Sequence, residues 1–116
     1  AYSASKGGLA TLTRNLGDSL MQEHGVRVNQ VNPGWVLTEN EATRKRDHGL
    51  KDDWCKDIPK KFAPSGRIFE PLEIATTVVH LLSKDCGPVS GQVFDLEQYP
   101  MIGRNPPKDE ETVSQK

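Results

Sequence analysis

The sequence predicts an α/β fold with parallel strands, because helix-like and strand-like segments alternate along it. The first helix is predicted over residues 3–24, where four leucines recur every three or four positions and Gly25 stands where a left-handed cap belongs. We expect this leucine stripe to pack on the core. A β-rich run over 26–31, ended by Pro33 and Gly34, predicts the strand that follows.

The second half of the chain shows the same alternation. Pro71 begins a second predicted helix, with Glu73 in its first turn, and we expect this helix to end near Ser83. Residues 91–96 are predicted to form the second strand. Helices that alternate with strands in this way are typical of parallel strands covered by helices.

The composition excludes several classes of function. A chain of 116 residues has room for one small domain, and with 34% apolar residues it has little material for a core of its own. Fifteen basic residues against sixteen acidic ones create no field that would attract nucleic acid or a membrane, and no apolar run is long enough to cross one. Cys55 and Cys86 have neither a metal-ligand spacing nor a C-x-x-C spacing. We therefore expect no metal site and a cytoplasmic protein.

The segment 39–61 differs in composition from the rest of the chain. Thirteen of its twenty-three residues are charged, seven of them basic and six acidic. Because such a stretch can bury little, we expect a mobile excursion or a polar helical flap. A basic patch for nucleic acid is the alternative, which the interspersed acidic residues disfavour. Residues 105–116 are predicted to form a flexible tail.

Tyr2 and Lys6 are four residues apart at the start of the first helix, so their side chains are expected to share one face. A phenol exchanges its proton poorly at neutral pH, and an ammonium about 4 Å away favours the phenolate. The pair therefore suits general acid/base chemistry. A Y-x-x-x-K spacing also arises by chance, so its weight depends on the residues around it.

Four short signatures occur in order along the chain. They are Y-x-A-S-K followed by small residues at 2–8, a strand with P-G-x-x-x-T at 27–38, G-R…P-x-E-I-A at 66–75, and G-Q at 91–92. This series resembles the short-chain dehydrogenase/reductase family. The resemblance implies that residues 1–104 are the carboxyl-terminal part of a doubly wound, parallel-sheet, Rossmann-like domain.

The resemblance implies a nicotinamide-dependent oxidoreductase. Tyr2 would give a proton to a ketone oxygen in reduction, or take one from an alcohol in oxidation. Lys6 would assist Tyr2 and hydrogen-bond the ribose of the cofactor, which is NAD or NADP. Four further positions would contact the cofactor: Pro33, Gly34, Val36 and Thr38. Thr38 is also a candidate N-cap of the segment that follows it.

The substrate implied by the resemblance is a small carbonyl or alcohol compound, with 39–61 as the flap that covers it. Trp35 and Trp54 are candidates for the wall of its pocket, and packing at the surface is an equal alternative for both. Residues 97–104 leave the last strand at the edge where ligands bind in such sheets, and Arg104 is the candidate contact there. Sealing the core is the alternative for this segment.

The chain also departs from the family pattern. The phosphate loop, the catalytic serine and the catalytic asparagine precede the tyrosine in this family, so we expect the 116-residue chain by itself to be inactive. Residues 95–98 read D-L-E-Q where many relatives carry D-G-G. A nucleotide-sugar epimerase or dehydratase shares Y-x-x-x-K, but the other signatures disfavour it. A non-catalytic assembly piece or a degenerate remnant is the remaining alternative, and we expect the intact enzyme to be a homo-oligomer.

Overall fold

The structure is a computed structural model that describes residues 1–98. The described chain divides into two compact units, one formed by Ala1–Pro33 and Ala75–Leu96 and the other by Gly34–Ile74 with Glu97 and Gln98. No helix among the described residues is long and apolar enough to span a bilayer. The elements in chain order are α1 (Tyr2–His24), β1 (Gln30–Pro33), α2 (Glu39–Asp47), the 3₁₀ turn η1 (Trp54–Lys56), α3 (Pro71–Leu82), the 3₁₀ turn η2 (Lys84–Cys86) and β2 (Val93–Leu96).

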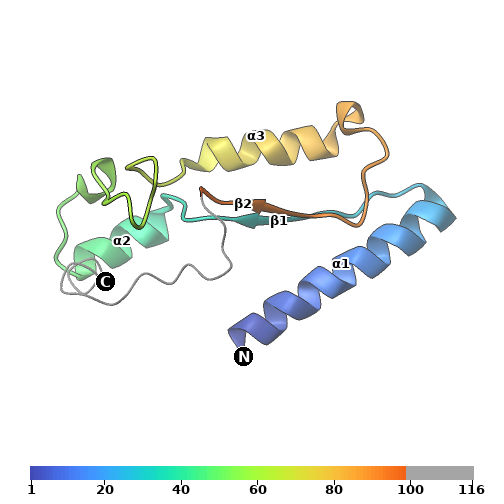
Figure 1. The fold of residues 1–116 in the computed structure, drawn as a ribbon, viewed down its shortest axis with the longest axis horizontal. Coiled ribbons are helices and arrows are strands. Elements are labelled where there is room, and N and C mark those ends of the chain that lie inside the picture. Colours follow the sequence, from blue (N-terminus) through green and yellow to red (C-terminus); the bar gives the residue numbers. More distant parts are fainter. Residues whose placement is uncertain (99–116) are drawn as a thin grey trace. The chain divides into compact units, whose positions relative to one another are not determined.

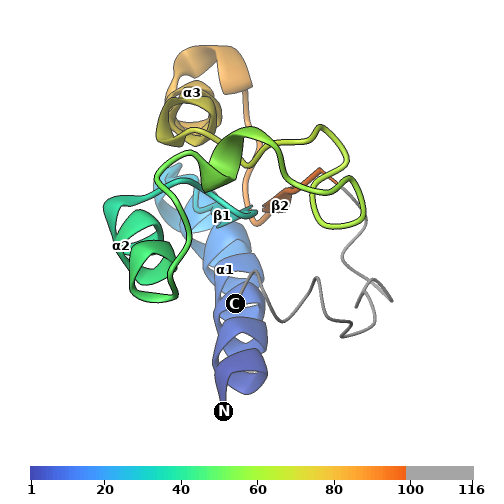
Figure 2. The ribbon, with the colours of Figure 1, turned by 90° about the vertical axis from the view of Figure 1, so that its left-hand side faces the viewer.

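The first unit is built on a pair of parallel strands. Gln30 of β1 is aligned with Val93 of β2, and Pro33 with Leu96. Helix α1 lies on one face of this pair, and the Ala75–Leu82 part of α3 lies on the other (Figures 1 and 2). Helices on both faces of parallel strands are the doubly wound arrangement. The predicted α/β fold with parallel strands is confirmed.

Both predicted helices are present close to their expected bounds. Helix α1 ends at a Gly25 cap with φ 65° and ψ 20°, whose amide bonds the last turn. This left-handed conformation suits a residue without a Cβ atom, as the sequence predicted. Helix α3 begins at Pro71 and ends at Leu82, one residue before the predicted end.

The first strand begins later than predicted. The sequence suggests a strand over 26–31, but the backbone ladder of β1 starts at Gln30. Immediately before it, the Val28 amide donates to Ser90 Oγ at 3.1 Å and the Asn29 side chain donates to a carbonyl of the opposite segment at 3.0 Å. Side chains therefore supply bonds that the backbone of the partner would make in a regular ladder.

Two glycines bring α1 against the segment that leads into β2. A Cβ atom built on Gly17 would lie 2.2 Å from both the Cα and the nitrogen of Gly91. Ser90 Oγ donates a hydrogen bond to the Gly17 carbonyl at 2.7 Å. The helix therefore packs backbone against backbone here, which excludes any side chain larger than hydrogen at position 17.

The prediction that the leucine stripe of α1 packs on the core is wrong for three of its four leucines, whereas Leu20 is half-buried. Leu9, Leu12 and Leu16 remain 45%, 51% and 37% exposed, whereas the buried residues of α1 are Thr13 and Gly17. Thr13 Oγ1 reaches the Gln30 side chain of β1 at 3.1 Å. The contact face is centred on these small residues because they allow the closest approach of the helix, and the leucines flank it.

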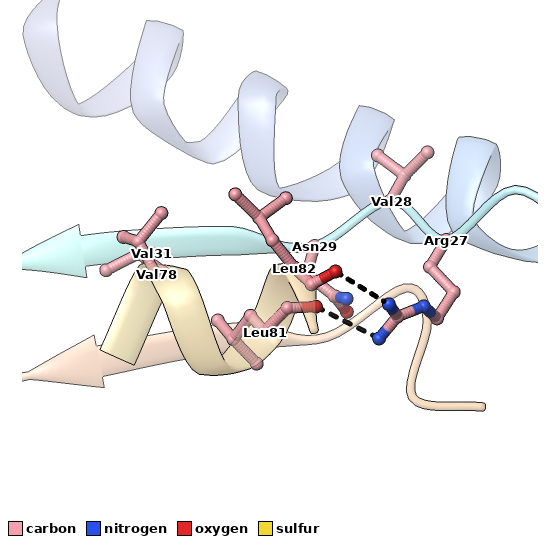
Figure 3. A pocket seen from close by; sticks show the side chains of 7 residues that line it. All are labelled: Arg27, Val28, Asn29, Val31, Val78, Leu81 and Leu82. Atoms are coloured by element: carbon pink, nitrogen blue, oxygen red, sulfur yellow. Dashed lines mark hydrogen bonds between the residues drawn. The ribbon is translucent and has the colours of Figure 1, made fainter. Parts of the chain in front are cut away.

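Arg27 joins the loop before β1 to the carboxyl end of α3 (Figure 3). Its guanidinium donates to the carbonyls of Leu81 at 2.9 Å and Ser83 at 2.9 Å. These carbonyls belong to the last turn, where a helix has acceptors without partners of its own and a negative dipole end. Next to this contact, β1 and α3 line a hollow of about 380 Å³ with mainly aliphatic side chains.

The second unit has its own small core. Ile58, Ala63 and Ile68 are buried, with five half-buried side chains packed around them: Trp35, Leu37, Trp54, Cys55 and Phe62. The segment 39–61 contributes α2 and η1, so the structure has the helical form of the predicted flap. The expectation that this segment buries little is wrong for Ile58 and for Lys45, which are each 4% exposed.

We predict that Gly17→Ala destabilises the chain by roughly 2–3 kcal/mol, because the new methyl group would overlap the backbone of Gly91. Gly8→Ala is the matched control. Nothing lies within 4 Å of its Cβ position in the same helix, so alanine there should stabilise by roughly 0.5–1 kcal/mol. Chemical denaturation followed by circular dichroism measures both. Equal effects of the two substitutions would contradict the close helix contact.

We also predict that Arg27→Met lowers the free energy of unfolding by about 1.5–3 kcal/mol, because carbonyls at the end of α3 lose a charged donor. Arg27→Lys keeps the charge but has one ammonium in place of a fork of donors, so it should lose less. Urea denaturation of the three proteins gives the comparison. A lysine variant as unstable as the methionine variant would show that charge contributes nothing at this position.

Candidate functional site

The predicted catalytic pair lies at the first turn of α1. Lys6 Nζ is 5.5 Å from the centroid of the Tyr2 ring, so the two side chains share one face as predicted. Tyr2 is 76% exposed, and its phenol is accessible from solution. Ser5 Oγ donates to the Tyr2 carbonyl at 2.8 Å, which keeps this turn closed. The pair therefore places a cation over the ring of an exposed tyrosine.

The residues after β1 form an extended strip in the second unit. Val36 pairs with Phe69 in a parallel bridge. The Leu37 amide donates to the Phe69 carbonyl at 2.8 Å, and the Phe69 amide donates to the Trp35 carbonyl at 2.9 Å. The backbone from Gly34 to Thr38 is consequently held by a partner segment that lies more than thirty residues later in the sequence.

Thr38 caps helix α2. Its side-chain oxygen accepts from the Glu41 amide at 3.2 Å, and its carbonyl accepts from Ala42 at 2.9 Å. The N-cap role that the sequence suggested is confirmed. A contact of Thr38 with a cofactor stays a prediction.

Trp35 and Trp54 pack on each other with ring centroids 5.7 Å apart and an interplanar angle of 32°. Lys45 Nζ lies 5.1 Å from the Trp35 ring and 5.3 Å from the Trp54 ring, within the range of cation–π attraction. The indole Nε1 of Trp35 donates to Glu41 Oε1 at 2.9 Å. We call these four residues the tryptophan cluster. The packing role for both tryptophans is therefore present, and a role in the substrate wall stays a prediction.

Charges within the tryptophan cluster alter one another. Burial lowers the pKa of Lys45, while the Glu41 carboxylate opposes this change and Arg44 adds to it. Partial burial raises the pKa of Glu41, but hydrogen bonds from Trp35 and Arg44 outweigh it and leave that pKa below its ordinary value. Glu41 thus stays ionised and faces the Lys45 ammonium across the cluster.

Arg67 and Glu73 explain why the signature G-R…P-x-E has this spacing. The Arg67 guanidinium donates to both carboxylate oxygens of Glu73, at 2.9 and 2.7 Å. Glu73 also accepts from the Glu70 amide at 2.8 Å, which is the carboxylate half of a capping box at the start of α3. The side-chain hydrogen bonds from Arg67, followed by the backbone bond from Glu70, lower the pKa of Glu73 to about 2.

Gln98 directly follows Leu96 and Glu97, the two positions at which the sequence departs from the D-G-G pattern. Its Oε1 accepts from the amide and the hydroxyl of Ser65, at 3.0 and 2.6 Å. Its Nε2 donates to the Arg67 carbonyl at 2.7 Å. The long amide side chain of Gln98 thus bonds to the turn that carries Arg67.

Comparison with known proteins identifies the family. A family model described as "Enoyl-(Acyl carrier protein) reductase" matches residues 1–97. The chain belongs to the short-chain dehydrogenase/reductase family. It is 38% identical over 97 residues to an uncharacterized oxidoreductase of Thermotoga maritima, covering 83% of this chain and 36% of that protein. It is 34% identical over 97 residues to galactitol 2-dehydrogenase (L-tagatose-forming) of Cereibacter sphaeroides, covering 84% and 36%.

Solved structures of short-chain dehydrogenases/reductases have the same fold. Actinorhodin polyketide ketoreductase with NADPH matches with a TM-score of 0.68 and 31% identity, over 84% of this chain and 38% of that one. The predicted family and fold class are therefore confirmed. The chain spans about a third of the length of the curated relatives it matches.

The predicted site residues of this family member fall into both units. Tyr2, Lys6 and Pro33 belong to the first unit, and Gly34, Val36, Thr38 and the two tryptophans belong to the second. Arg104, most of the 97–104 segment and the predicted tail over 105–116 lie outside the described residues. Within residues 1–98, no group of three or more His, Cys, Asp or Glu side chains is arranged to hold a metal ion.

Sequence reasoning missed several residues that the structure makes important. Gly17 carries a usable signal, because a glycine inside a helix usually has a packing reason. Arg27 and Lys45 carry none, since nothing in their neighbours distinguishes them from other surface cations. Their partners lie at the end of α3 and on the two tryptophans, and only the fold brings these groups together.

We predict that Glu73 makes the chain sensitive to acid. Its pKa is about 2 in the folded chain and 4.5 ordinarily, so its contribution is fully present above about pH 5 and is lost as the pH falls towards 2. In Glu73→Gln, the free energy of unfolding should therefore fall less over this interval than in the wild type. Glu23→Gln, on the exposed side of α1, is the control. Parallel pH profiles for wild type and Glu73→Gln would contradict the prediction.

Proposed function

We propose that the complete protein is an NAD(P)-dependent oxidoreductase that moves a hydride between a nicotinamide and a carbonyl or alcohol substrate. The observation that carries the proposal is the exposed Tyr2 with the Lys6 ammonium beside it, in a chain of the short-chain dehydrogenase/reductase family. A phenol can give a proton to a substrate oxygen and take one back, which is the task of a general acid/base.

The proposed reaction assigns the proton to Tyr2. In the reducing direction, the Tyr2 hydroxyl gives its proton to the carbonyl oxygen while a hydride reaches the carbonyl carbon. In the oxidising direction, the phenolate takes the proton of the alcohol. Lys6 stabilises the phenolate, since an opposite charge nearby favours the ionised form. A lysine ammonium has three N–H donors, so Lys6 can also hydrogen-bond the hydroxyls of the nicotinamide ribose.

The strip after β1 is the proposed contact for the nicotinamide. Pro33 ends β1 and Gly34, Val36 and Thr38 follow it, at the carboxyl end of the strand where open α/β sheets bind ligands. Two of these residues suit contact with the flat nicotinamide ring. Gly34 has no side chain that would keep the ring away from the backbone, and the Val36 backbone is held by Phe69. The cofactor supplies the hydride, and these residues would orient its ring.

The relatives support a small carbonyl or alcohol compound as the substrate class. One relative is a galactitol dehydrogenase, and one similar structure is a polyketide ketoreductase with NADPH. These two names describe an alcohol and a ketone substrate, which are the two sides of the same reaction. In this proposal 39–61 is the substrate flap, and Trp35, Trp54 and Arg104 are the candidate substrate contacts. Cytoplasmic location and homo-oligomeric assembly stay predictions.

We predict that Tyr2→Phe, placed in the complete enzyme, removes nearly all turnover and leaves NAD(P) binding close to the wild type. The ring keeps its shape and loses only the proton that the transition state needs. Lys6→Ala should impair both turnover and cofactor binding. Steady-state kinetics and calorimetric titration measure the two effects. Retention of a tenth or more of the rate by Tyr2→Phe would refute the assignment and favour a non-catalytic assembly role.

A further inference from the structure

Lys45 stands out among the described residues as a charged side chain that is buried. It is 4% exposed, although it lies in the most highly charged segment of the chain. Removing a charge from water is unfavourable unless other groups replace the lost hydration. Here the faces of Trp35 and Trp54 and the nearby Glu41 carboxylate provide that replacement. A lysine held in this way connects the two rings that it touches.

The contacts of Lys45 join two parts of the predicted flap to the residue at position 35, which precedes it. Trp35 lies before α2, Lys45 lies within it, and Trp54 lies in η1 after it. The two rings are in contact at 5.7 Å, and the ammonium lies about equally far from each. The loop between α2 and η1 is consequently closed by aromatic and cationic groups, and both tryptophans also pack against the small core of Ile58, Ala63 and Ile68.

Trp35 connects the tryptophan cluster to the proposed nicotinamide strip. Its backbone lies directly between Gly34 and Val36, and its carbonyl accepts from the Phe69 amide at 2.9 Å. Its indole nitrogen donates to Glu41 in the first turns of α2. With Lys45 over its ring as well, Trp35 cannot turn without breaking contacts on several sides. These contacts therefore hold the strip around Gly34 and Val36 and the flap 39–61 in one fixed arrangement.

We propose that Lys45 is a positioning residue that holds the flap 39–61 folded on the strip around Gly34 and Val36 before any ligand arrives. The inference rests on the proposed function, which assigns the strip to the nicotinamide and the flap to the substrate. A flap that is already folded does not lose conformational entropy when the substrate binds. Loss of the Lys45 contacts transfers that cost to substrate binding and leaves the chemistry at Tyr2 unchanged.

Fluorescence of the chain itself tests the contact, because Trp35 and Trp54 are the only two tryptophans in the sequence. Lys45→Ala should shift the emission maximum to longer wavelength and weaken the near-ultraviolet circular dichroism of the stacked indoles. Lys45→Arg should restore both, since a guanidinium also packs on aromatic faces. Lys51→Ala is the control, an exposed lysine of the same segment. Identical spectra for Lys45→Ala, Lys51→Ala and wild type would overturn the inference.

Kinetics of the complete enzyme test the positioning role. Lys45→Ala should raise KM for the carbonyl substrate about tenfold and change kcat less than about twofold, as expected when binding alone is weakened. Lys45→Arg should return KM to the wild-type value. An unchanged KM in Lys45→Ala would overturn the inference, and so would an equal rise of KM in Lys51→Ala. Failure of the proposed function gives a different result: the wild-type enzyme then shows no turnover, but the spectral effects of Lys45→Ala persist.

A further pair of variants covers the case in which Lys45→Ala does not fold. Lys45→Met and Lys45→Arg both fill the space over the two rings, but only arginine keeps the charge. The inference expects a raised KM for Lys45→Met and a normal one for Lys45→Arg. Equal KM values for the two variants would show that filling the space is enough, and would overturn the role of the cation.

Discussion

The approach of Gly17 to Gly91 is the constraint on which the first unit depends. Without side chains at these two positions, α1 reaches the segment before β2 and Ser90 can bond the Gly17 carbonyl. The Gly91 amide donates to the Val28 carbonyl at 2.7 Å, so this contact also aligns the segments that enter the two strands. A larger residue would separate the helix from the strands, because backbone atoms cannot yield as a flexible side chain does.

The second unit is stabilised by interactions of another kind. Its apolar core is small, and polar groups complete it: Arg67 on Glu73, Gln98 on the 65–67 turn, and Lys45 on two tryptophans. Of these groups Lys45 is a buried charge, and a buried charge adds little stability unless it has partners, but it can favour one arrangement over others. A segment that must keep a defined shape over a ligand, yet contains few aliphatic residues, can be ordered by such contacts.

These two kinds of packing suit the chemistry that we propose. Tyr2 and Lys6 need access to a ligand, and they lie at an exposed helix start rather than in a core. The strip at Gly34 and Val36 needs a fixed backbone, and the bridge to Phe69 supplies it. In the proposed function, the reactive groups lie on an exposed helix turn and the orienting groups lie on a backbone that is held by the bridge to Phe69.

The sequence by itself determined the helices, the parallel strands, the Tyr2–Lys6 pair and the Thr38 cap. These depend on local spacing, capping and turn residues, or on signatures whose parts lie close together in the chain. Only the tertiary structure decided that α1 packs on its small residues rather than its leucines, and that Lys45 is buried against two tryptophans. Both outcomes depend on how closely distant segments can approach one another. That distance follows from the shapes of two surfaces that meet only in the folded chain, so no local pattern encodes it.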